Sequence, residues 1–116
     1  MTIRIYHNPR CSKSRATLQL LEEHAVAPQV IRYLDTPPDA DTLRELLARL
    51  GIGARELMRT GEAAYRDNGL DDPTLDEEAL IAAMVEFPIL IERPIVVMGD
   101  RAIIGRPPER VLELLK

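Results

Sequence analysis

Apolar and polar residues alternate at the amino end of the chain, in the pattern of a strand with one buried face. Ile3 and Ile5 are the apolar positions of the segment 2–6, and Asn8-Pro9 ends it. A second apolar segment at 29–34 stops before two consecutive prolines and has the same character. Both segments are predicted to be strands.

A helix is predicted between these strands. It begins near Cys11 or Ser12 and ends before Pro28, because proline disfavours helical backbone in the residue before it. Its buried face is predicted to carry Leu18, Leu21 and Ala25. A helix that joins two strands favours a right-handed crossover, so we expect these strands to pair in parallel.

The middle of the chain has a helical pattern. Asp39 or Asp41 is predicted to cap a helix that ends at Gly51. Its leucines recur at the spacing of one helical face: Leu43, Leu46, Leu47 and Leu50. Residues 53–68 suggest a shorter helical piece. No strand pattern occurs from residue 35 to residue 87.

A capping box formed by Thr74 and Glu77 predicts a third helix in this region. Pro88 follows that helix. Its predicted buried residues are Leu80, Ile81, Met84 and Val85.

The carboxyl end returns to strands. Two apolar segments, 94–98 and 102–104, flank a turn and predict an antiparallel hairpin. A terminal helix follows over 107–115, opened by two prolines. The order is βαβ, a helical insert, then ββα. This order predicts an α/β fold with a mixed four-stranded sheet.

The organisation is that of one domain over residues 1–116, with the helical insertion at about 39–87. Of the 116 residues, 46% are hydrophobic and 29% are charged, as in an ordinary globular protein.

No apolar run approaches the ~18–20 residues that span a bilayer, and no signal-peptide pattern opens the chain. We therefore expect a cytoplasmic protein without a membrane partner. The net charge of −4 argues against general nucleic-acid binding.

Cys11 is the single cysteine, which excludes an internal disulfide. With only two histidines beside it, a Cys/His metal site is not expected either. Residues 1–21 nevertheless contain four basic residues and no acidic residue, and Cys11 lies among them. A lone cysteine is often a small buried hydrophobe, but this one has polar and basic neighbours at a predicted turn.

The position of Cys11 favours a reactive thiolate. A cysteine at a strand-to-helix junction faces the unpaired N–H groups and the positive end of the helix dipole. Arg10, Lys13 and Arg15 are expected to stabilise negative charge on the sulfur.

His7 either raises the thiolate fraction or binds backbone at the turn. The second histidine, His24, is expected at the surface. Helix starts also bind oxyanions, so the thiolate and an anion site are predicted together.

The spacing Cys11-Ser12-Lys13-Ser14 is that of a dithiol redox motif with serine in the second position. An oxidised Cys11 therefore has no resolving cysteine in the chain. Turnover requires an external thiol, which points to glutathione and glutaredoxin.

Residues 6–15 resemble the opening of the glutaredoxin-coupled arsenate reductase family. Three further segments match family motifs in the same order: Leu57-Met58-Arg59, Glu92-Arg93-Pro94-Ile95-Val96-Val97 and Gly105-Arg106-Pro107. The resemblance covers nearly the whole chain and implies a thioredoxin-like fold with a helical insertion. It also implies arsenate as substrate, glutathione as co-substrate and glutaredoxin as partner, with no tightly bound cofactor and no metal.

The resemblance also assigns roles to individual residues. It implies that Cys11 attacks arsenate and that three arginines hold the oxyanion and its thiol adducts: Arg59, Arg93 and Arg106. The planar guanidinium group suits this role, because it binds two oxygens at once and keeps its charge. His7 and Ser14 are expected to contribute to substrate binding. Pro94 is expected to follow a cis peptide bond that faces the cysteine.

One departure from the family pattern leaves alternatives open. Ser12-Lys13-Ser14 follows the nucleophile, whereas the best-known members have Gly-Thr-Ser there. A monothiol oxidoreductase of the same fold with another substrate is therefore one alternative. A regulator resembling the Spx proteins, which bind RNA polymerase, is the other, although Ser14 replaces the second cysteine of their redox switch.

Overall fold

The structure is a computed structural model that describes residues 2–116. The chain forms two compact units. The first combines the amino-terminal segment up to Thr36 with Arg93–Lys116, and the second is the insert Pro37–Glu92. The insert is slightly longer at both ends than the 39–87 expected from the sequence.

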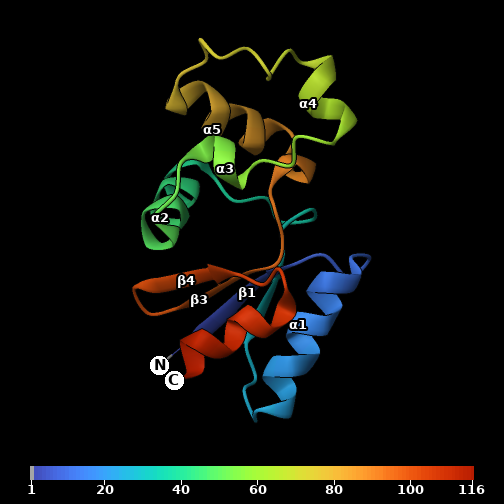
Figure 1. Ribbon diagram of the computed structural model, residues 1–116, viewed down its shortest axis with the longest axis vertical. Helices are drawn as coiled ribbons and strands as arrows, with labels where there is room; N and C mark the ends of the chain where they lie inside the picture. The colour runs from blue at the N-terminus through green and yellow to red at the C-terminus, as the bar shows by residue number, and fades with distance from the viewer. Residues whose placement is uncertain (1) are drawn as a thin grey trace. The chain divides into compact units, whose positions relative to one another are not determined.

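A four-stranded sheet forms the centre of the first unit, in the order β2-β1-β3-β4 (Figure 1). Its strands are β1 (Ile3–His7), β2 (Gln29–Arg32), β3 (Ile95–Met98) and β4 (Arg101–Ile104). β1 pairs with β2 in parallel and with β3 antiparallel, and β3 pairs with β4 antiparallel. The predicted mixed sheet is confirmed. β2 ends earlier than residue 34, because the chain turns after Arg32, whose carbonyl accepts from Asp35 N at 2.9 Å.

The helix α1 (Ser12–Glu23) packs against η2 (Pro108–Leu115), and the two lie side by side in Figure 1. Leu21 of α1 joins a buried cluster with residues of the sheet and of η2: Ile5, Val96, Ile103, Val111 and Leu114. The strand register places Ile5 opposite Val96, and Val96 opposite Ile103. This cluster joins α1 and η2 to the sheet.

Two expectations for these helices were wrong. α1 ends at Glu23, and Ala25 is exposed with a φ of 60° rather than buried on the helix. The terminal helix is 3₁₀, not α. Its buried residues Val111 and Leu114 are three apart, and a helix with three residues per turn brings such positions onto one line.

The second unit is helical. Its elements are α2 (Ala40–Leu50), α3 (Ala54–Leu57), α4 (Ala63–Asp67), α5 (Glu77–Glu86) and η1 (Pro88–Leu90). α5 packs against α2, α3 and η1, and α4 packs against η1. The predicted ends of α2 are confirmed: Asp39 accepts from Thr42 N at 2.8 Å, and Gly51 has a φ of 70°. The expected helix at 53–68 is two short helices, α3 and α4.

The capping box predicted for α5 was wrong. Asp76 caps the helix and accepts from Ala79 N at 2.8 Å. Glu77 instead accepts from Ala54 N at 2.7 Å and so ties α5 to the start of α3. Val85, expected in the core, is half-buried. Within residues 2–116, no helix is both long and apolar enough to cross a membrane.

Candidate functional site

Cys11 is the N-cap residue of α1, at the end of the loop that follows β1. Its backbone is extended, with φ −94° and ψ 123°. The loop is folded by Asn8, whose carbonyl oxygen accepts from Cys11 N at 3.0 Å and whose side-chain Oδ1 accepts from Arg10 N at 3.0 Å. Cys11 is half-buried, neither enclosed in the core nor fully exposed.

Two of the predicted arginines lie at this sulfur. Arg106 Nη1 donates to Cys11 Sγ at 3.8 Å and to the carbonyl oxygen of Arg93 at 3.2 Å. The Arg93 side chain also forms a hydrogen bond with the sulfur, and the residue is only 8% exposed. Segments far apart in the sequence thus place two cations beside one sulfur.

The backbone around β3 and β4 holds these arginines together. The Arg93–Pro94 peptide bond is cis, as expected, and the Arg106–Pro107 bond is cis as well. Gly105 N donates to the carbonyl oxygen of Pro94 at 2.9 Å, which joins the segment before β3 to the segment after β4. Arg106, the next residue, is therefore fixed relative to Arg93.

The surroundings of Cys11 favour its ionised form. Partial burial by itself raises the pKa of the thiol. Hydrogen bonds from Ser14 N, the Arg93 side chain and Lys13 N outweigh that effect, with the Arg93 charge adding to them, so the pKa lies below its ordinary value. The two backbone donors belong to the first turn of α1, where N–H groups have no partner within the helix. These donors favour the thiolate, and the reactivity of Cys11 stays a prediction.

His7 and Ser14 contact each other within this loop. His7 Nδ1 lies 2.6 Å from Ser14 Oγ, which also accepts from Asn8 N at 3.0 Å. Ser14 is fully buried and His7 is nearly so. Burial, together with the charges of Arg32 and Arg15, lowers the pKa of His7 and favours the neutral ring. The two side chains therefore contact each other within the loop, and their expected contribution to substrate binding stays a prediction.

Asn8 and Thr17 were missed by the sequence interpretation. Asn8 is 5% exposed and organises the loop, and Thr17 is fully buried. Thr17 Oγ1 donates to Lys13 O at 2.8 Å and lies 3.3 Å from the carbonyl oxygen of Gly105. The buried residues of α1 are Ser14, Thr17 and Leu21, so the inner face near Cys11 is polar. A pattern of apolar residues in the sequence does not reveal a buried face that is polar.

Arg59 belongs to the helical unit. Its Nε lies 3.1 Å from Glu62 Oε1 and its Nη1 lies 3.7 Å from Glu92 Oε1. Its backbone N donates to Leu90 O at 2.7 Å, next to the bridge between Met58 and Ile91. The side chain is thus held between two carboxylates of its own unit, and its expected role toward arsenate stays a prediction.

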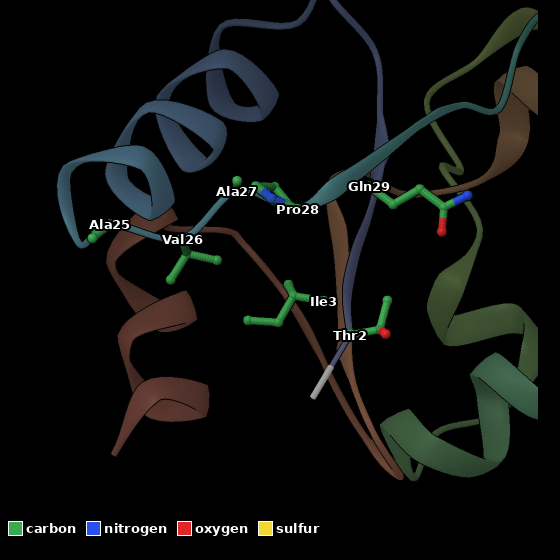
Figure 2. A pocket seen from close by; sticks show the side chains of 7 residues that line it. All are labelled: Thr2, Ile3, Ala25, Val26, Ala27, Pro28 and Gln29. Atoms are coloured by element: carbon green, nitrogen blue, oxygen red, sulfur yellow. The ribbon is translucent and has the colours of Figure 1, made fainter.

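Two hollows of the first unit differ in their chemistry. One, of about 610 Å³, lies beside the start of β1 and is lined by Thr2, Ile3 and residues 25–29 (Figure 2). Its side chains carry no charge, and it lies at the opposite end of β1 from Cys11. The other, of about 200 Å³, is lined by residues 7–10 with Arg32, Leu34 and Asp35, directly before Cys11. In the described part of the chain, no three His, Cys, Asp or Glu side chains are grouped as metal ligands.

Comparisons with known proteins agree with the resemblance found in the sequence. Residues 6–114 match the ArsC family. A protein of Escherichia coli strain K12, named Uncharacterized protein YfgD, is 60% identical over 114 residues, which cover 97% of this chain and 96% of the relative. The arsenate reductase of Neisseria meningitidis serogroup A is 49% identical over 114 residues, which cover 97% of each chain. The structure of arsenate reductase from Vibrio cholerae matches with a TM-score of 0.95, at 54% identity and with 97% of each chain covered.

Proposed function

This chain belongs to the ArsC family, and from that premise we propose that it is an arsenate reductase that takes electrons from glutathione and glutaredoxin. Its fold is the thioredoxin-like α/β fold of the family, with a mixed four-stranded sheet. Relatives named arsenate reductase support an oxidoreductase with arsenate as substrate. The thiol partners and the individual steps below are part of the proposal.

The observation that carries the proposal is the 3.8 Å approach of Arg106 Nη1 to Cys11 Sγ. A thiolate repels a tetrahedral oxyanion unless cations neutralise the charge of both. Arg106 and Arg93 flank the sulfur, so an arsenate oxygen bound between the guanidinium groups brings arsenic close to Sγ. The planar guanidinium fork matches two oxygens of such an anion.

In the first step, the Cys11 thiolate attacks the arsenic of arsenate. A bond forms between Sγ and arsenic, and one arsenate oxygen leaves as water after taking up protons. The arginines stabilise the negative charge that gathers on the remaining oxygens. Arsenic is still As(V) after this step, because the exchange of ligands moves no electrons between the elements.

Arsenic is then reduced through an attack at sulfur. The glutathione thiolate attacks Cys11 Sγ, a disulfide forms between the two sulfurs, and the electron pair of the sulfur–arsenic bond stays on arsenic. Arsenic leaves as arsenite, As(III). Glutaredoxin then attacks the glutathione sulfur of the mixed disulfide and releases the Cys11 thiol. These thiols are cytoplasmic reductants, and we place the reaction in that compartment.

An arsenite-formation assay with arsenate, glutathione and glutaredoxin tests the proposal. The wild-type protein is expected to turn over only with all three reagents present, and Cys11→Ser is expected to be inactive. Arg93→Ala and Arg106→Ala are each expected to reduce kcat/KM by a factor on the order of 100, as for the loss of one oxyanion-binding group. Arg110→Ala, at an exposed arginine of η2, is the matched control and is expected to keep wild-type activity.

Two other outcomes contradict the proposal. A reactive Cys11 thiol without arsenite formation under any of these conditions favours a monothiol oxidoreductase with another substrate. A stable complex with RNA polymerase that survives Cys11→Ser, again without arsenite formation, favours a regulator resembling the Spx proteins.

A further inference from the structure

The hollow of about 200 Å³ before Cys11 has a charge pattern that the arsenate chemistry does not use. Arg10, Arg32 and Asp35 line it, and neither Arg93 nor Arg106 does. The rest of its lining consists of Pro9, the buried His7 and Asn8, and the exposed Leu34. The hollow therefore offers two cations and one anion on a polar floor with an apolar rim.

The charged groups of the hollow are available to a ligand. Arg32 Nε lies 3.3 Å from Asp35 Oδ2, and the two side chains are 62% and 66% exposed. An ion pair this exposed is weak, so a ligand with charges of both signs can insert beside it without a large penalty. Arg10 is exposed as well, while its backbone N is fixed to Asn8 Oδ1.

On this basis we propose that the hollow is a recognition subsite for the charged ends of glutathione. Glutathione has an ammonium and a carboxylate on one carbon at its γ-glutamyl end, a second carboxylate at its glycine end, and the thiol between them. The Arg32–Asp35 pair complements the γ-glutamyl ammonium and carboxylate. Arg10 complements the glycine carboxylate through a bidentate contact.

The reach of the tripeptide fits this assignment. Arg10 precedes Cys11 directly, so their Cα atoms are ~3.8 Å apart. Glutathione is longer than the about 10 Å of three extended residues, because its first peptide bond runs through the glutamyl side chain. Since residues 7–10 line the hollow directly before Cys11, a thiol of this length in the hollow can approach Cys11 Sγ. This inference rests on the proposed function for its role in turnover, but the subsite itself can be measured without arsenate.

The test uses the reaction of Cys11 with two disulfides, followed by mass spectrometry of the intact protein. With oxidised glutathione, the Cys11 thiolate forms a mixed disulfide and releases one glutathione thiolate. With hydroxyethyl disulfide, which carries no charge, the same exchange releases mercaptoethanol. We expect Arg10→Ala and Arg32→Ala each to slow the glutathione reaction roughly five- to tenfold more than they slow the uncharged reaction. Arg110→Ala is expected to leave both rates unchanged.

Altered thiols, used as the reductant in the arsenite-formation assay, distinguish the contributions of the two ends of the subsite. Glutathione esterified at glycine has no charge on that carboxyl group, so Arg10→Ala is expected to raise the KM for glutathione but not for this ester. Cysteinylglycine lacks the γ-glutamyl group, so Arg32→Ala is expected to leave its KM unchanged.

Equal slowing of both disulfides in the arginine variants overturns the subsite, because the arginines then act only on the ionisation of Cys11. Unchanged rates with oxidised glutathione overturn it as well, even where arsenate reduction is intact. Conversely, discrimination between the disulfides in a protein that makes no arsenite supports the subsite and refutes the proposed function.

Discussion

The Thr17 hydroxyl lies 3.3 Å from the carbonyl oxygen of Gly105 and joins the second turn of α1 to the residue before Arg106. The contact leaves no room for a side chain at Gly105. A Cβ atom there would lie 2.6 Å from Thr17 Oγ1 and 3.0 Å from Pro94 Cγ. The packing of α1 against this segment therefore places Arg106 at the Cys11 sulfur.

Gly105→Ala is predicted to destabilise the protein and to reduce arsenate turnover more than stability alone explains. Relief of the overlap moves α1 or the segment that carries Arg106, at a cost of about 1–3 kcal/mol in the free energy of unfolding. Chemical denaturation measures that loss. Gly61→Ala is the control, because a Cβ atom at Gly61 meets nothing within 4 Å. Equal stability of the two variants would contradict the tight contact.

Arg93→Ala is predicted to raise the pKa of Cys11 toward its ordinary value. The variant removes a hydrogen bond and a positive charge that favour the thiolate, while the N–H groups of Ser14 and Lys13 remain. The pH dependence of alkylation by iodoacetamide reports the shift. Arg93→Lys keeps the charge without the planar fork and is expected to fall between wild type and Arg93→Ala. An unchanged alkylation profile in Arg93→Ala would show that Arg93 does not contribute to the ionisation of the sulfur.

His7 is predicted to make the protein less stable below about pH 6.5. Burial and the charges of Arg32 and Arg15 lower the folded-state pKa of His7 below the unfolded value of 6.5. The unfolded chain then binds more protons in that window, so the free energy of unfolding falls as the pH drops below 6.5. Denaturation at several pH values is expected to show a flatter profile for His7→Gln. Parallel profiles for the two proteins would contradict this role.

Ser14→Ala is predicted to cost about 1–3 kcal/mol of stability, because it leaves buried polar groups of His7 and Asn8 without their partner. Thermal and chemical unfolding measure the change. Ser12→Ala is the matched control in the same helical turn. Its side chain is exposed, so a change within about 0.5 kcal/mol is expected. A Ser14 variant as stable as the Ser12 variant would rule out a structural role for the hydroxyl.

Several elements could be predicted from the sequence because their signals act within a few residues. Asp39 and Gly51 bound α2 through a side-chain cap and a left-handed residue, which are local effects. The hairpin of β3 and β4 also follows from two apolar segments around a short turn. The capping box predicted from Thr74 and Glu77 was wrong because that prediction also used only local signals. Their local pattern is that of a capping box, but Glu77 binds Ala54 N, 23 residues away.

The sequence by itself determined the strand and helix order, the family and the position of Cys11 at the start of a helix. Tertiary structure decided which groups meet the sulfur. Arg106 is 95 residues from Cys11 along the chain, and no local pattern specifies that distance. The pairing of β1 with β3 brings the two ends of the chain together, and the buried contacts of Ser14 and Thr17 orient the loops. Such contacts depend on which faces pack once the sheet has formed, because the free energy of burial is gained only between surfaces that meet.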